Sequence, residues 1–491
     1  MHANCIHYGS PQFRILSDKQ IEELHLATLQ ILERTGVLFE CREALEILGD
    51  AGANVANSNR IKIPSYMVEQ ALATAPKMIT LYTREGEPAI VLNGQTGSHF
   101  GPPSAPREIL DPHTGKRREC YVEDVADIAR LVDALPNMEW SMTGASNTTL
   151  PLSTCDISDK VNLLQCILNC SKPIICEAND VSSLREMIDL CSIVAGGEEY
   201  LRKKPFFGGS SEPVSPLTQG KDAMEKSLVC AEKRIPNVVY SMPMAGVTTP
   251  ATFAGCLAIA NAEFLSQLVV LQLKSPGVPV IYGAIPSVMD MKTMIFTYGA
   301  PEMSLMAGAL TELCHYYKLP MFGTAGCTDA EIIDVQAGIE ITYQILISAL
   351  TGADLIHDVG EVYHGTAVSP ELIVLVDEII DMLNVAMGGI KINDETIPLE
   401  LIERIGPRGT YISEKHTLEH FRSFWAPRVF DRSAVKEEIP YYCGELLKKR
   451  TVEILRNHKP KPLPEDLVRE LKKMEKIWLD RVGLKEYPKK K

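Results

Sequence analysis

Eight short apolar runs, each followed by an amphipathic segment of helical period, repeat between residues 98 and 390 of this chain. Successive runs start roughly 32 to 42 residues apart, which is the length of one strand, one helix and two loops. Strands that alternate with helices pair in parallel through right-handed crossovers, and eight such units close into a barrel. The sequence therefore predicts an α/β fold, a (β/α)8 TIM barrel. The runs centre on His99-Phe100, Trp140-Ser141-Met142, Ile174-Ile175-Cys176, Phe206-Phe207-Gly208, Val238-Val239-Tyr240, Val280-Ile281-Tyr282, Met321-Phe322-Gly323 and Leu355-Ile356-His357.

The chain on either side of the barrel is predicted to be mostly helical and to pack around it. Residues 1–97 begin with a capping box, Ser17 and Gln20, and end in a β ribbon. Residues 391–491 form a charged helical extension whose aromatic cluster (Phe421, Phe424, Trp425 and Phe430) is expected to pack on the barrel. An open, doubly wound sheet is the alternative fold, but its Gly-x-Gly-x-x-Gly motif is missing after the first strand.

Charge and cysteine usage narrow the class of protein. A net charge of −14, with no basic stretch except the tail, argues against nucleic-acid binding. No apolar run approaches the roughly 20 residues of a transmembrane helix, and residues 1–20 lack the order of a signal peptide. The 13 cysteines are scattered, many within apolar helical segments, as reduced core residues are. We therefore expect a cytoplasmic protein without a membrane or nucleic-acid partner.

In such a barrel the chemistry lies at the carboxyl ends of the strands, and here those ends are small, apolar and rich in hydroxyl groups. Lysine and arginine are nearly absent, and neither a phosphate cradle nor a nucleotide fingerprint is present. A metal-dependent hydrolase stays an alternative, with His99, Glu177, Glu212 and His357 as its ligands. Without a His-x-His or a close cysteine pair, we expect no metal.

The segment 319–331 reads as a strand, a turn of small residues and the start of a helix. Cys327 would lie near that helix N-terminus, where the pKa of a thiol can fall, so it is a candidate nucleophile. No partner base stands beside it, and a small wall residue is the simpler interpretation. Aromatic residues near the strands, including Phe100, Tyr282, Phe322 and Tyr363, suit a quaternary ammonium ion, which is held by cation–π contacts. Each of them alone is more often a core residue.

Three stretches resemble the trimethylamine methyltransferase family, whose barrel proteins demethylate methylated amines with a corrinoid protein. They are Ile31-Leu32-Glu33-Arg34-Thr35-Gly36-Val37, Ser211-Glu212-Pro213-Val214-Ser215-Pro216-Leu217 and Gly323-Thr324-Ala325-Gly326-Cys327-Thr328-Asp329. Trimethylamine enzymes of that family carry pyrrolysine near the seventh strand, at or beside Cys327 here, whereas this chain has only standard residues. The resemblance thus implies the non-pyrrolysine branch, with glycine betaine as first substrate and proline betaine, carnitine or γ-butyrobetaine next.

The chemistry agrees with the missing pyrrolysine, because a betaine nitrogen is permanently cationic and leaves as a neutral amine. The resemblance implies a corrinoid (cobalamin) on a partner protein, no cofactor held tightly by the chain itself, and a homo-oligomer. The expected catalytic residues are Glu212, His357 and Cys327. The expected substrate-binding residues are Phe100, Glu177, Tyr282, Phe322, Thr328 and Tyr363. Neutral donors, among them backbone N–H groups at the helix starting near Thr328, are expected to meet the betaine carboxylate. A non-catalytic betaine-binding protein stays a further alternative.

Overall fold

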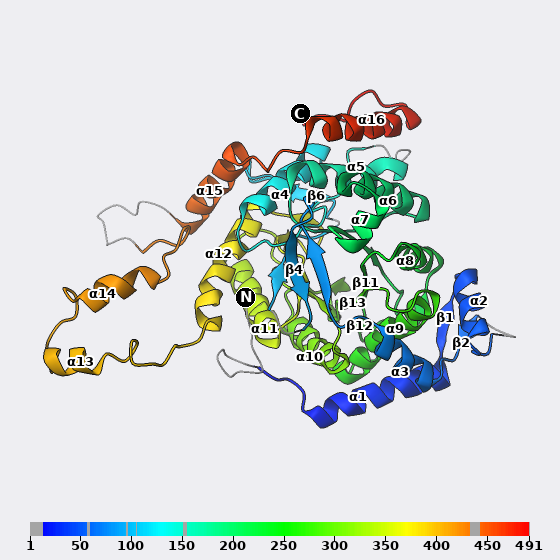
Figure 1. The fold of residues 1–491 in the computed structure, drawn as a ribbon, viewed down its shortest axis with the longest axis horizontal. Helices are drawn as coiled ribbons and strands as arrows, with labels where there is room; N and C mark the ends of the chain where they lie inside the picture. The colour runs from blue at the N-terminus through cyan, green and yellow to red at the C-terminus, as the bar shows by residue number, and fades with distance from the viewer. Residues whose placement is uncertain are drawn as a thin grey trace.

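Seven parallel strands form one curved sheet in the order β5-β17-β16-β13-β11-β9-β8 (Figure 1). The segment predicted as the second strand closes the circle through two isolated bridges, Phe100 to Met138 and Ser141 to Ile174. The order around the barrel is therefore the order along the chain, which confirms the (β/α)8 barrel and excludes the open sheet. The strands are β5 His99–Phe100, β8 Ile174–Cys176, β9 Phe207–Ser211, β11 Asn237–Ser241, β13 Val280–Ala284, β16 Met321–Thr324 and β17 Leu355–His357. This computed structural model describes residues 13–55, 59–94, 97–104, 106–150, 155–432 and 442–490, so most of the stretch searched for a signal peptide lies outside it.

Helices surround the barrel as a ring (Figure 1). They are α4 Val122–Ala134, α5 Cys155–Asn169, α6 Val181–Ala195, α7 Glu198–Lys203, α8 Lys221–Lys233, α9 Phe253–Lys274, α10 Pro301–Tyr317, α11 Val335–Thr351 and α12 Pro370–Met387. By length and composition α9 resembles a membrane-spanning helix, but 83% of its apolar window is buried within this structure. Its apolar surface is covered by the barrel and by neighbouring helices, as in a central core helix.

The loops at the carboxyl ends of the strands form two small sheets. One contains β12 Met244–Ala245, β14 Ser287–Asp290 and β15 Ile295–Phe296. The other contains β6 Glu108–Leu110, β7 Arg117–Glu119, β18 Glu361–Val362 and β19 Ala367–Val368. These sheets fix the backbone where the strands end, which is where this fold places its chemistry.

The N-terminal region wraps one side of the barrel and closes its base. It comprises α1 Asp18–Gln30, the π-helical turn η1 Ile31–Thr35, β1 Val37–Phe39, α2 Arg42–Asp50, β2 Arg60–Ile61, α3 Ser65–Thr74, β3 Ile79–Tyr82 and β4 Pro88–Leu92. Strand β1 also pairs with β10 Thr218–Gln219, which follows β9 of the barrel. The capping box between Ser17 and Gln20 is confirmed at α1. Figure 1 shows α1 and α3 lying along α9.

The β3–β4 hairpin plugs the amino end of the barrel. Ile79, Leu81, Ile90 and Leu92 pack inside the barrel against strand residues. The backbone N–H of Tyr82 donates to the carbonyl of Pro205, which precedes β9, over 2.9 Å. Among the described residues, the hairpin thus closes the amino end, which leaves the carboxyl end as the side from which ligands would reach the interior.

Asp354 joins this plug to the barrel. Its Oδ1 accepts from the backbone N–H groups of Asn93 and Gly94 at 2.9 and 2.8 Å, and its Oδ2 accepts from that of Met321 at 2.9 Å. In Asp354→Asn one oxygen becomes an NH₂ group, which leaves a buried N–H facing a donor. We expect a loss of about 1–3 kcal/mol in the free energy of unfolding, measured with urea. The exposed substitution Asp394→Asn is the control, and equal midpoints for the two variants would contradict the assignment.

The C-terminal extension has a packed part and a projecting part. Helices α15 Cys443–Asn457 and α16 Glu465–Arg481 lie on the barrel helices. Residues 388–424, here called the arm, carry α13 Leu399–Ile405, α14 Lys415–His420 and the 3₁₀ turn η3 Phe421–Ser423, and extend away from the barrel (Figure 1). Of the predicted aromatic cluster, Trp425 donates to Asp381 and Phe430 packs on the core, but Phe421 and Phe424 are exposed. The prediction that all four pack on the barrel is therefore wrong for the two on the arm.

Candidate functional site

Side chains from three strand ends, from the loop after the last of them and from one tyrosine within a strand meet at the carboxyl end of the barrel. Glu177 follows β8, Glu212 follows β9, Tyr240 belongs to β11, and His357 ends β17. Asp358 and Glu361 follow in the next loop, and Glu361 begins β18. We call these six residues the acidic chamber. Two further aromatic rings border it, Phe322 of β16 and Tyr298 after β15.

Tyr240 organises the outer pair of carboxylic acids. Its hydroxyl donates to Glu177 and interacts with Glu212, and the two carboxyl groups also interact with each other. Burial, and then the charge of Glu177, raise the pKa of Glu212 to about 7. Although protein surrounds this carboxyl on most sides, the Glu212 side chain still reaches solvent. That combination is expected of a group in a funnel that opens outward.

Asp358 and Glu361 form the deeper acidic pair. Both are buried, and one oxygen of each, Oδ2 and Oε2, has no hydrogen-bond partner. Burial and the charge of Glu177 raise the pKa of Asp358 to about 8. Burial, followed by Asp358 and Glu177, raises the pKa of Glu361 well above its usual range. Without a bound cation these acids are largely protonated at pH 7.

His357 is neutral and fixed in orientation. Its Nδ1 donates to the carbonyl of Gly323 over 2.8 Å, so Nε2 is the bare nitrogen, 3.3 Å from Asp358 Oδ1. Burial lowers the pKa of His357 to about 4. Its ring lies 4.1 Å from that of Phe322 and 5.8 Å from that of Tyr240, centroid to centroid. The chamber thus combines aromatic faces with carboxyl groups and holds no cation of its own.

The structure does not bring all the predicted site residues into this chamber. Glu177, Glu212, His357 and Phe322 meet there, whereas Phe100 and Tyr282 belong to the core between strands and helices. The Tyr282 hydroxyl bonds Asn261 of α9 at 3.2 Å, on the opposite side of β13 from the interior. Successive residues of a strand face opposite sides of the sheet, so Ile281 takes the inward position instead.

Three other predicted residues lie on the loops around the chamber. Tyr363 is on the outer rim, where the Arg117 guanidinium stands 4.1 Å from its ring centroid. Thr328 is buried, and its hydroxyl donates to Glu340 over 2.5 Å, so it holds the loop together. Cys327 is buried in the inner cluster with Sγ 3.3 Å from Gln344 Oε1. Burial and the nearby acids raise the thiol pKa far above normal, which favours a wall residue over a nucleophile.

The metal-hydrolase alternative finds no ligand set in the described part of the chain, where no three His, Cys, Asp or Glu residues can share an ion. His99, one of its four proposed ligands, begins β5 and pairs instead with Glu139 at 2.8 Å. The other three proposed ligands, His357, Glu177 and Glu212, lie at the carboxyl end of the strands, whereas His99 lies at the amino end.

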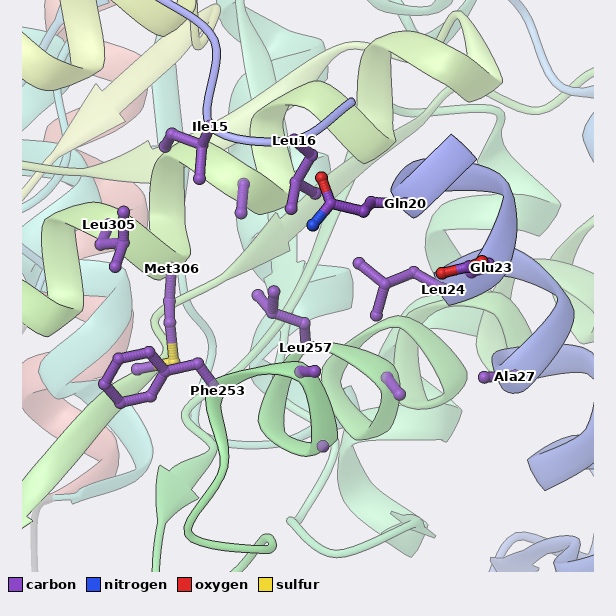
Figure 2. Close-up of a pocket in the computed structure, with 14 residues that line it drawn as sticks. Ile15, Leu16, Gln20, Glu23, Leu24, Ala27, Phe253, Leu257, Leu305 and Met306 are labelled. Atoms are coloured by element: carbon purple, nitrogen blue, oxygen red, sulfur yellow. The ribbon is translucent and has the colours of Figure 1, made fainter. Parts of the chain in front are cut away.

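A separate apolar pocket lies outside the barrel, between α1 and helices α9 and α10 (Figure 2). It measures about 580 Å³, and its walls include Leu16, Leu24, Leu257 and Met306. Glu23 is the one ionisable residue among those that line it in the described structure. One carboxylate in an otherwise apolar wall offers no cluster of polar groups for chemistry, whereas the acidic chamber does, so the chamber is the candidate site.

Sequence reasoning missed Tyr240, Tyr298, Asp358 and Glu361. Asp358 and Glu361 stand in the strand-end stretch 357–361, from which only the histidine was chosen. A count of acids over all strand ends would have found both. Tyr240 would have required the inward or outward parity of β11, which a run of apolar residues does not reveal.

Known proteins match this chain over nearly its whole length. The family model described as trimethylamine methyltransferase (MTTB) matches residues 1–476. A trimethylamine methyltransferase MttB of Desulfitobacterium hafniense is 33% identical, over 95% of this chain and 94% of its own. A glycine betaine methyltransferase of the same species is 30% identical, over 93% and 95%. The solved monomethylamine methyltransferase of Methanosarcina barkeri aligns with 96% of this chain and 88% of its own, at 12% identity and a TM-score of 0.48. The chain belongs to the trimethylamine methyltransferase family.

Proposed function

We propose that the protein transfers a methyl group from a quaternary amine to the cobalt of a corrinoid carried by a partner protein. The observation that carries the proposal is the acidic chamber, a carboxyl-lined and aromatic-lined site at the open end of the barrel. The family membership of the chain and its similarity to a glycine betaine methyltransferase support the same chemistry. Standard residues throughout the seventh-strand region favour a substrate that is already cationic.

The residues of the chamber hold and orient the substrate. The faces of Tyr240 and Phe322 receive the N-methyl groups, and the carboxyl groups balance the positive charge. When the methyl group leaves, the C–N bonding pair stays on nitrogen and the product amine is neutral, so no acid catalyst is needed. The positive charge on nitrogen disappears in the transition state. Because acids with raised pKa values must first lose their protons to pair with the bound cation, part of the binding free energy is used for that step, which limits how strongly the bound substrate is stabilised.

The corrinoid would supply the cobalt nucleophile, and the open rim fits the approach of a protein that carries it. The β14–β15 hairpin on the rim exposes Met291 and Met294, whose side chains are 70% and 61% exposed. Flexible methionines are common on surfaces that bind another protein. The described cysteines are free, and all except Cys443 are buried, which agrees with a cytoplasmic location.

The test is methyl transfer to free cob(I)alamin, followed by its visible absorbance. The panel contains glycine betaine, proline betaine, carnitine, γ-butyrobetaine, choline and tetramethylammonium, with trimethylamine for comparison. Transfer from at least one quaternary amine supports the proposal. Binding of these amines without transfer would indicate a sensor, and neither binding nor transfer would reject a quaternary amine substrate.

We also propose a homo-oligomer in which the arm of one copy lies on a second copy. Ten large apolar side chains of the arm are exposed: Ile390, Ile392, Ile397, Leu399, Ile402, Tyr411, Ile412, Leu418, Phe421 and Phe424. At on the order of 100 Å² each, they would bury about 1000 Å² per copy, and a stable interface needs about 800 Å².

Replacing Ile390, Ile392 and Ile412 together with glutamate should convert the oligomer to monomers in sedimentation velocity. These side chains are 87%, 70% and 82% exposed, so the fold should be kept, as circular dichroism would verify. Tyr200→Glu, at an exposed apolar position on α7, is the control. A monomeric wild-type protein would reject this interface.

A further inference from the structure

A bound quaternary ammonium ion draws the acids of the chamber toward their charged forms, so the carboxylate of a zwitterionic substrate would meet further negative groups there. Glu177 and Glu212 stand at its opening, and Asp358 and Glu361 stand at its floor. Lys226 of α8 donates to the carbonyl of Ala178, the residue after Glu177, over 2.7 Å, and its charge acts to lower the pKa of Glu212. A substrate with both an ammonium and a carboxylate would place its negative end among these acids.

The backbone donors expected to receive such a carboxylate are already engaged. Helix α11 begins at Val335, not beside Thr328, and Asp334 caps it by accepting from Ala337. The N–H of Thr328 donates to the Glu361 carbonyl at 3.0 Å, and that of Asp329 donates to Glu340 Oε2 at 3.0 Å. The N–H groups just before them donate to Gln344 Oε1. The backbone N–H groups of residues 325–330 therefore all have partners within the protein.

Ser210 places a neutral donor without a partner in the interior, whereas the Thr324 hydroxyl already lies 3.3 Å from His357 Nδ1. Ser211 bonds Ser227 of α8 at 2.7 Å, so the preceding residue, Ser210, points to the other face of β9. Its buried hydroxyl has no partner. A single hydroxyl suits an uncharged polar tail better than it offsets the repulsion of four carboxyl groups.

On these observations we propose that the substrate is an N-methylated quaternary ammonium ion with an uncharged remainder, not a betaine. The unpartnered oxygens of Asp358 and Glu361, buried and next to the aromatic rings, receive its positive charge. This inference rests on the proposed function and narrows its substrate class. Tetramethylammonium and choline are the probes, and glycine betaine is the zwitterion for comparison.

Binding of such an ion should drive protons off the chamber. Burial and mutual repulsion keep the free acids protonated, and a permanent cation reverses that balance by favouring the charged forms. The pKa values of Asp358 and Glu212 should therefore fall on binding. Affinity should rise with pH between about 6 and 9, by up to about tenfold per pH unit for each proton released. The neighbouring His357 is neutral throughout that range, and the pKa values of Tyr240, Tyr298 and Cys327 lie far above it.

The experiment is isothermal titration of the full chain with the three ligands, at pH 6, 7 and 8 and in two buffers of different ionisation enthalpy. We expect choline and tetramethylammonium to bind at least 100-fold more tightly than glycine betaine, with net proton release. Betaine binding as tight as choline, or cation binding without proton release, would overturn the inference and leave the proposed function standing. If no quaternary amine binds, the proposed function falls, and the inference falls with it.

Two isosteric variants locate the effect. Asp358→Asn and Glu361→Gln should each weaken choline binding at least tenfold and reduce the protons released, while betaine binding stays equal or improves. Both replace largely protonated acids with neutral groups of the same shape, so the fold should be kept. Glu371→Gln, at an acid of raised pKa on the outer helix α12, should change neither quantity. Unchanged choline binding in both chamber variants would overturn the assignment of the charge to these acids.

Discussion

Glu212→Lys should abolish amine binding and methyl transfer while leaving the fold intact. Glu212 reaches solvent at the chamber opening, so a lysine can be accommodated without repacking. Its ammonium would pair with Glu177 and occupy the place of the substrate cation. Two charges about 6 Å apart interact by about 3 kcal/mol at an effective dielectric constant near 20. Because Glu212 is partly protonated at pH 7, we expect affinity to fall about 100- to 1000-fold.

The measurements are titration calorimetry and the cob(I)alamin assay. The control is Glu22→Lys, which makes the same charge change at an exposed position on α1. It should keep wild-type affinity, which separates a local effect from the change in net charge. Near-normal turnover in Glu212→Lys would place the reacting amine outside the chamber.

Trp140→Ala should cause the largest loss of stability, about 3–5 kcal/mol. Trp140 is completely buried inside the barrel, in the segment that closes the sheet by isolated bridges instead of a regular strand. Its Nε1 donates to the carbonyl of His99 over 3.0 Å, and its ring lies 5.9 Å from that of Phe322. Few ladder hydrogen bonds hold this segment, so the indole supplies much of the closure.

Urea denaturation of both proteins measures this loss. Trp425→Ala removes the same side chain from a half-buried position on the C-terminal extension, where Nε1 donates to Asp381, and should cost clearly less. Because Phe322 borders the acidic chamber, Trp140→Ala should also weaken choline binding. Equal losses in the two tryptophan variants would show that the barrel closes without this contact.

The barrel could be predicted from sequence because its signal is long and periodic. The eight predicted runs fall on the seven strands and on the bridged segment that closes the barrel, and the predicted β ribbon is the β3–β4 hairpin. Which residues of a strand point into the barrel and which point toward the helices was harder to predict. Strands that are buried on both faces show no alternation of apolar and polar residues. Val238-Val239-Tyr240 and Val280-Ile281-Tyr282 read alike, yet Tyr240 faces the chamber and Tyr282 faces α9.

The start of α11 shows a second limit of sequence reasoning. The pair Thr328 and Asp329 resembles a helix start, but the chain runs four more residues as a loop before Asp334 caps the helix. Glu340, one helical turn inside α11, bonds the Thr328 hydroxyl and so fixes that loop. A bond between residues 12 positions apart decides the boundary, and no local pattern records it.

The β3–β4 plug has a consequence for the sequence of events in catalysis. A barrel that is closed at its amino end can be entered only from its carboxyl end, and the amine and the corrinoid-bearing partner would both have to approach from there. If the proposed function holds, the smaller molecule would have to enter first, and the docked partner would then exclude bulk water during transfer. The demethylated amine would stay enclosed until the partner dissociates, so association and dissociation of the partner would limit the rate of turnover.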